Sequence, residues 1–191
     1  MSILNEKIDV RFGVVIAMIL AAAFLRLVPH PMNFAPIGAM ALFGAAYFKS
    51  RWAALLVPLA ALWLSDLAVT NIVHSAFYPS FTFFYEGFYW VYGATVLTVL
   101  LGFLTLNKVS FGRVAGSAIG AAILFFLITN FGSWIYAPIY SKDLSGLMAS
   151  YIAGIPFFRG TLAGNLLYSA VLFGGFELAQ RRFAVLRTSA A

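Results

Sequence analysis

The stretch LAALWLSDLAVTN, residues 59–71, carries a single charged side chain, Asp66, near the end of an otherwise apolar run. A second stretch, AGIPFFRGTLAGN at residues 153–165, repeats this pattern with Arg159. A charge inside a membrane-spanning segment costs free energy and usually faces a partner or a watery cavity. If both runs cross a membrane, Asp66 and Arg159 are candidates for a functional polar site.

The composition identifies an integral membrane protein. The 191 residues are 63% hydrophobic and only 9% charged, with a mean hydropathy of +0.95, whereas soluble domains carry roughly a quarter charged residues. The length suits one domain. The absence of cysteine excludes disulfides, thiolate metal sites and a cysteine nucleophile. The sequence also lacks the glycine-rich phosphate loop of ATPases, so we expect no ATP hydrolysis by this chain.

Apolar runs and turn residues predict an all-α bundle of six transmembrane helices in a single domain, residues 1–191. A span needs about 20 mostly apolar residues, and the segment 137–158, which contains Pro138, Gly146, Gly154 and Pro156, is too interrupted to qualify. We expect it to lie on the membrane or to fold over a pocket. We read the first run as a retained helix, because no small-residue cleavage pattern follows it. The predicted helices are 10–28, 34–48, 52–70, 86–106, 113–136 and 160–181.

The distribution of basic residues predicts the orientation. Nine of the twelve Lys and Arg residues lie in the N-terminal segment, in alternate connections and in the C-terminal segment. By the positive-inside rule, both termini are cytoplasmic. Since these charges serve topology, the net charge of +6 does not predict nucleic-acid binding. The nine residues are Lys7, Arg11, Lys49, Arg51, Lys108, Arg113, Arg181, Arg182 and Arg187.

With this topology, polar residues from five helices gather at the outer end of the bundle. Asp66 could pair with Arg159 or Arg26 as a structural bridge, or the whole set could form a small-molecule site. The aromatic segment FYPSFTFFYEGFYW at 77–90 could be an interfacial belt or a lid over such a site. The set comprises Arg26, His30, Asp66, Tyr85, Glu86, Asn130 and Arg159.

Metal and nucleophile signals are weak. His30 and His74 both lie on the outer side, but two histidines without close spacing rarely form a metal site, and a histidine between prolines is more often structural. Ser80 has no base at a diagnostic spacing. No intrinsic cofactor is expected.

Small residues four apart occur twice, as Ala17 and Ala21 in the first helix and as Gly116 and Gly120 in the fifth. Such pairs allow close approach of helices. They fit packing within the bundle or contact with a partner subunit.

The chain resembles a family of small bacterial membrane proteins described as transporters. The resemblance is carried by RLVPHPMNFAPIGAMALFGAAYF (26–48), LAALWLSD (59–66), FLITNFGSW (126–134) and AGIPFFRGTLAGNLLYSAVLFGGFE (153–177). That family is similar to the S components of energy-coupling-factor vitamin transporters, and most similar to solitary cobalamin transporters of the BtuM type. The resemblance implies six helices in the bacterial inner membrane and an outward-facing substrate pocket capped by loops.

The BtuM pattern also implies residue roles. His30, Asp66, Tyr85 and Arg159 match its histidine, aspartate, tyrosine and arginine in kind and order, whereas Ser80 stands where the pattern has a cobalt-ligating cysteine. Serine is a hard ligand that stays protonated near neutral pH. The resemblance therefore implies uptake of cobalamin or a related corrinoid, with its cobalt near Ser80, but does not extend to cobalt–sulfur ligation or to removal of cyanide.

We therefore expect a vitamin uptake transporter, with Asp66, Tyr85 and Arg159 binding the ligand and His30 and Ser80 lining its pocket. The resemblance also implies that Ala17 and Ala21 could dock on an ATPase-coupling module, although solitary members are thought to act alone. Two other classes stay open. A membrane enzyme could use Asp66 or Glu86 as acid or base, and a cell-envelope scaffold would have a closed core behind residues 71–85.

Overall fold

The computed structural model describes residues 10–187, which are helical apart from short connections and contain no strand. The helices are α1 (Val10–Phe24), α2 (Ile37–Tyr47), α3 (Arg51–Ala68), α4 (Phe88–Thr105), α5 (Phe111–Tyr136) and α6 (Leu144–Arg182). Short turns are η1 (Leu25–Leu27), η2 (Val69–Val73), η3 (Ser75–Phe77) and η4 (Ala184–Leu186). The predicted all-α membrane fold is confirmed at the level of helix content and apolar length.

Five of these helices are long and apolar enough to cross a membrane. They are α1 with η1, α3 with η2, α4, α5 and α6. The predicted helix 34–48 is the exception, since α2 has only 11 residues. At 1.5 Å per residue it is ~16 Å long, about half of a bilayer core.

The short helix α2 lies in the centre of the bundle. It packs against α1, α3, α4, α5 and α6, and eight of its residues are buried. Phe43 meets Phe173 and Phe176 of α6 edge to face, at centroid distances of 5.4 and 5.6 Å. A helix surrounded by others contacts little lipid, so its length need not match the bilayer.

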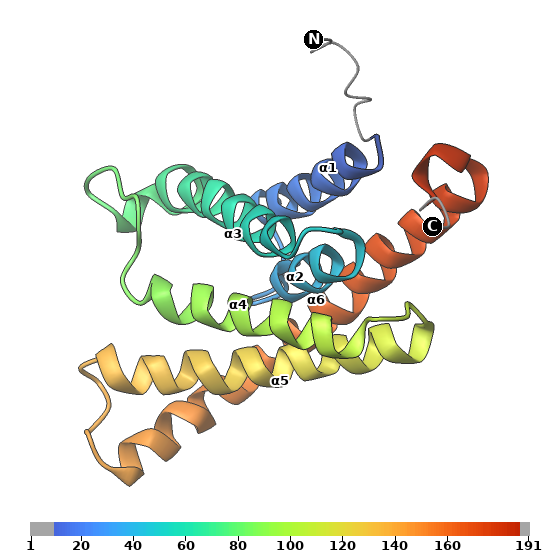
Figure 1. Cartoon of the computed structure of the whole chain (residues 1–191). Helices are drawn as coiled ribbons and strands as arrows, with labels where there is room; N and C mark the ends of the chain where they lie inside the picture. Colours follow the sequence, from blue (N-terminus) through green and yellow to red (C-terminus); the bar gives the residue numbers. More distant parts are fainter. Residues whose placement is uncertain (1–9, 188–191) are drawn as a thin grey trace.

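The two ends of the bundle differ (Figure 1). At one end, here called the terminal end, α1 begins and α6 finishes, and the turns 48–50 and 106–110 lie there too. At the other, the loop end, lie the longer connections 25–36, 69–87 and 137–143. The predicted N-terminal charge Lys7 lies outside the described residues.

The segment 137–158 is more regular than predicted. Helix α6 already begins at Leu144 and runs through Gly154 and Pro156 to Arg182. The side chain of Asp143 accepts a hydrogen bond from the Gly146 amide at 2.8 Å and so caps the helix. Packing on α5 then outweighs the proline, which can only remove one helical hydrogen bond and kink the helix.

Contacts between α5 and the early part of α6 explain why the helix continues through Gly154 and Pro156. The Ser150 hydroxyl donates to the carbonyl of Asn130 at 2.8 Å, and the Tyr151 hydroxyl donates to the carbonyl of Leu127 at 2.9 Å. Gly154 lies directly on the Asn130 side chain, where a Cβ atom would approach Oδ1 to 2.2 Å. The glycine therefore serves close helix packing rather than helix termination.

Candidate functional site

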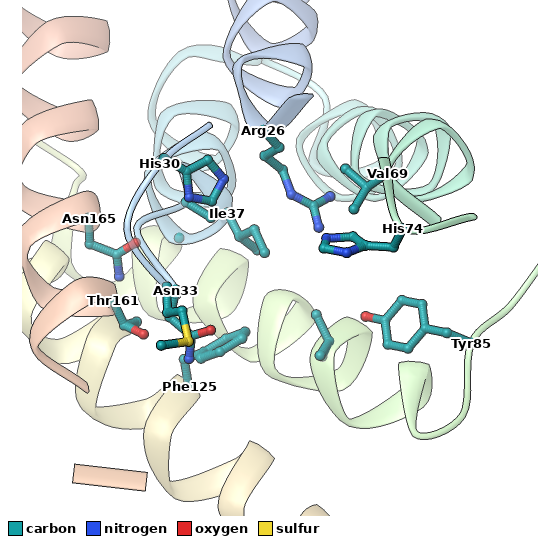
Figure 2. A pocket seen from close by; sticks show the side chains of 14 residues that line it. Arg26, His30, Asn33, Ile37, Val69, His74, Tyr85, Phe125, Thr161 and Asn165 are labelled. Carbon is teal, nitrogen blue, oxygen red and sulfur yellow. The ribbon is translucent and has the colours of Figure 1, made fainter. Parts of the chain in front are cut away.

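A cavity of about 420 Å³ opens at the loop end of the bundle, and we call it the main cavity. Every long connection of that end except 137–143 contributes to its wall, together with α2, α4, α5 and α6 (Figure 2). Its size and mixed lining are typical of small-molecule sites. The lining residues are Arg26, His30, Met32, Asn33, Ala35, Ile37, Gly38, Val69, His74, Tyr85, Val91, Phe125, Thr161 and Asn165.

A second hollow of about 380 Å³, the side cavity, adjoins the main cavity. The two share Asn33, Val91, Phe125 and Thr161 as lining residues. The side cavity extends between α5 and the early part of α6, toward Asn130 and Tyr140. The two cavities are therefore neighbours along the same wall.

Arg26 is the main charged group of the cavity wall. Its Nη1 lies 2.7 Å from Oδ1 of Asp66 and donates to the Ser65 hydroxyl at 2.6 Å. Tyr92 of α4 donates to the other carboxylate oxygen of Asp66 at 2.9 Å. Asp66 is buried, and its contact with Arg26 positions the guanidinium. The guanidinium of Arg26 points into the cavity (Figure 2).

This arrangement selects between the two pairings predicted for Asp66. The partner is Arg26, and it forms the only salt bridge among residues 10–187. Arg159 is exposed on α6 and does not line either cavity.

The backbone around Asp66 has an unusual form. Helix α3 passes into the π-helical turn η2, from Val69 to Val73, and such turns often occur at functional sites. The Asn71 side chain in this turn accepts a hydrogen bond from the Thr82 amide at 2.7 Å and donates one to the Thr82 carbonyl at 2.9 Å. The connection between α3 and α4 is thereby fixed over the cavity.

Tyr85 approaches the cavity from this connection (Figure 2). Burial, and then the negative charge of Asp66, raise the pKa of Tyr85 well above its ordinary value. Its hydroxyl therefore stays protonated at physiological pH and can donate a hydrogen bond to a ligand.

His30 and His74 both line the main cavity, from the α1–α2 connection and from the turn after η2. The His30 Nδ1 atom lies 2.9 Å from the Pro31 carbonyl, which leaves Nε2 free of that contact. No cluster of three or more His, Cys, Asp or Glu side chains suited to a metal ion occurs within residues 10–187. The two imidazoles are thus better suited to contact a ligand than to hold a resident metal.

Four predicted site residues lie outside both cavities. Ser80 and Glu86 are exposed in the α3–α4 connection, and neither lines the main or side cavity. Arg159 is the third, and Asp66, which is buried against Arg26, is the fourth. Asn130 does line the side cavity, and its Nδ2 donates to the Phe126 carbonyl at 2.8 Å.

The aromatic residues of 77–90 contribute less to the wall than their number suggests. Tyr85 alone among them lines the main cavity. Phe77, Phe81 and Phe83 are exposed, and Phe84 lies against Trp63 at a centroid distance of 6.4 Å. This exposed aromatic set agrees with the interfacial belt that the sequence left open.

Sequence reasoning missed several polar residues of the site. Asn165 is buried in α6, and Thr161 precedes it by one helical turn, so both face the main cavity (Figure 2). Their spacing of four residues, which places both on one face of a helix, was the only signal in the sequence. Tyr92, the second partner of Asp66, gave no local signal, because its contact joins residues 26 positions apart.

A protein-family model matches the chain from residue 6 to residue 186. It covers nearly the whole chain, including the described helices and both cavities. The chain belongs to DUF6580, a family of unknown function. No curated protein and no solved structure matches the chain significantly.

Proposed function

We propose that this DUF6580 protein is a vitamin uptake transporter that binds cobalamin or a related corrinoid. In this proposal the chain forms six spans in the bacterial inner membrane, with both termini cytoplasmic and the loop end outside. The proposal combines the resemblance to S components of the BtuM type with the cavities at the loop end.

The main cavity is the observation that carries the proposal. It lies at the end of the bundle that the charge distribution turns outward, and its lining mixes polar and apolar residues in equal number. The adjoining side cavity gives room for the periphery of a large ring. A corrinoid has an apolar macrocycle edged with amides, which matches such a lining.

Individual residues suit this ligand. Arg26 and Tyr85 can donate to amide carbonyls or to the phosphate of a nucleotide tail, and Asn165 can both donate and accept. Arg26 is oriented by Asp66, so Asp66 acts on the ligand through Arg26 rather than by contact. An imidazole from His30 or His74 is a better axial ligand for cobalt than the exposed Ser80 hydroxyl.

The competing classes have less support. The scaffold hypothesis expects a closed core behind residues 71–85, yet His74 and Tyr85 line an open cavity there. For an acid–base enzyme, Asp66 is occupied by Arg26 and Tyr92, and Glu86 is exposed outside the cavities.

A partner module stays part of the proposal. Ala17 and Ala21 lie on an exposed strip of α1, on which a Cβ atom at Gly13 would meet nothing within 4 Å. This small-residue strip is available to a coupling subunit with a matching helix.

An absorbance spectrum tests the proposal. The detergent-purified protein is incubated with cobalamin and freed of unbound ligand, and retained corrin bands are expected. Val91→Trp, which fills the wall between the two cavities, should abolish retention. The control Leu97→Trp changes an exposed position of the same helix and should retain the bands. A colourless wild-type protein would reject the corrinoid assignment.

A further inference from the structure

A third hollow opens toward the opposite end of the bundle. It is a groove of about 520 Å³ between the first half of α5 and the last part of α6, here called the terminal groove. Val114 and Phe173 belong to its apolar wall. The proposed vitamin transport assigns no role to it.

Small residues create the groove. Ala115 and Ala118 of α5 face Ala170 and Gly174 of α6, and a Cβ atom at Gly174 would meet nothing within 4 Å. From Leu166 to Arg181 the wall follows α6 for about 22 Å at the helical rise. One leaflet of the hydrocarbon core is about 15 Å thick. The groove is therefore long enough to extend from the middle of the bilayer to the membrane surface.

One arginine lies at the mouth of the groove. Arg181 lines it, and within residues 10–187 its guanidinium forms no salt bridge. Ser110 begins α5 there, but its side chain makes no capping hydrogen bond, so the first amides of the helix have no side-chain acceptor. A helix N-terminus with free amides and a nearby arginine attracts a phosphate.

A buried hydroxyl points to an oxygen-bearing ligand below that mouth. Ser169 is 1% exposed, lines the terminal groove, and its Oγ has no hydrogen-bond partner. Asn165 contacts the carbonyl of Ala118, so in these antiparallel helices Ser169 is level with Val114, one turn or ~6 Å below Ser110. A glycerol ester lies at about this depth below a lipid phosphate.

One carboxylate, that of Glu177, also lines the groove. Glu177 accepts hydrogen bonds from the Tyr47 hydroxyl at 2.6 Å and from Gln180 at 3.1 Å. These neutral donors from α2 and α6 hold Oε1 of the carboxylate in place, and Glu177 keeps its charge.

We infer that the terminal groove binds one anionic phospholipid. Arg181 and the N-terminus of α5 hold the phosphate, Ser169 donates to an ester carbonyl, and one acyl chain follows the apolar wall toward Leu166. Basic pockets between transmembrane helices are a common basis for binding anionic lipids. The inference is independent of vitamin transport, since the groove shares no lining residue with the main or side cavity.

Native mass spectrometry of the full chain with added phosphatidylglycerol or phosphatidylethanolamine tests this inference. The wild type should retain one phosphatidylglycerol in preference to phosphatidylethanolamine. Arg181→Gln should weaken this binding about fivefold, while Arg182→Gln, the adjacent exposed arginine outside the groove, should not change it. Equal retention of both lipids, or equal effects of both arginine variants, would overturn the inference.

Two further variants test where the lipid lies. Gly174→Leu should fill the groove and prevent retention, whereas Gly116→Leu, at an equally open position of α5 outside the groove, should retain the lipid. Ether-linked phosphatidylglycerol, which lacks the ester carbonyl, should bind the wild type about two- to threefold more weakly. In Ser169→Ala the ester and ether lipids should bind equally. Dimers that displace the lipid would identify a second copy as the occupant instead.

Discussion

Arg26, just after α1, and Asp66, near the end of α3, form an ion pair of 2.7 Å that joins the wall of the main cavity to its buried support. Ser65 and Tyr92 complete the hydrogen bonds of this pair. The single charge in the apolar stretch 59–71, Asp66, is thus explained by its ion pair with Arg26 of the cavity wall.

Breaking this pair should destabilise the bundle. Asp66→Asn leaves the partly buried Arg26 without its counter-charge, and loss of one partner of a buried pair costs about 3 kcal/mol. In thermal unfolding in detergent, Asp66→Asn and Arg26→Gln should each lower the melting temperature clearly. The double variant should be destabilised by less than the sum of the two single destabilisations. Strict additivity would show that the two charges are not coupled.

Arg159→Ala is the matched comparison for this prediction. Because Arg159 is exposed and lines neither cavity, its removal should change stability by no more than about 0.5 kcal/mol. Cobalamin retention should also stay unchanged. Impaired retention would restore the binding role that the sequence suggested.

The two histidines of the main cavity should differ from Ser80 in the spectrum of bound cobalamin. If an imidazole reaches the cobalt, His30→Ala or His74→Ala shifts the corrin bands toward those of the water-ligated form. Ser80→Ala, at an exposed position outside the cavities, should leave the bands in place. A shift with Ser80→Ala alone would place the cobalt near the hydroxyl instead.

Hydropathy predicted most of the fold because membrane spans depend on local composition. The predicted 113–136 begins within two residues of α5 and ends with it, and 86–106 differs from α4 by two residues at its start and one at its end. The early part of α6 was missed, because Gly154 and Pro156 were read as helix breakers. Their tolerance depends on contacts with Asn130 and neighbouring carbonyls of α5, which no local pattern contains.

The candidate site was predictable only in part, for a similar reason. A charge in an apolar run identified Asp66, and topology placed Arg26 at the same end. The contributions of Thr161 and Asn165 depend on which face of α6 meets the cavity. Small polar side chains are common in transmembrane helices, so their presence alone does not indicate a site.

Gly160 should be required for the shape of the main cavity. A Cβ atom there would lie 2.1 Å from the carbonyl oxygen of Met32, whose connection forms part of the wall. Gly160→Ala must displace that backbone, at about 1–3 kcal/mol, and should reduce ligand retention. Gly93→Ala is the control, since nothing lies within 4 Å of its Cβ position and alanine favours a helix by about 0.5–1 kcal/mol. Equal melting temperatures for both variants would contradict the close contact.

The start of α6 should depend on pH through Asp143. Hydrogen bonds from the Gly146 amide and from the Ser145 and Ser141 hydroxyls lower the pKa of Asp143 from 3.8 to about 2. Because the folded pKa is depressed, the stabilisation is fully present above pH 3.8 and is lost as the pH falls through about 2.

Thermal unfolding of the wild type and of Asp143→Asn in an acid-stable detergent measures this contribution. The asparagine side chain can still cap α6 but carries no charge, so the wild type should melt at the higher temperature at neutral pH. The difference should stay constant down to about pH 4 and vanish near pH 2, where the aspartate is protonated. A difference that persists unchanged at pH 2 would show that the carboxylate charge does not stabilise the helix start.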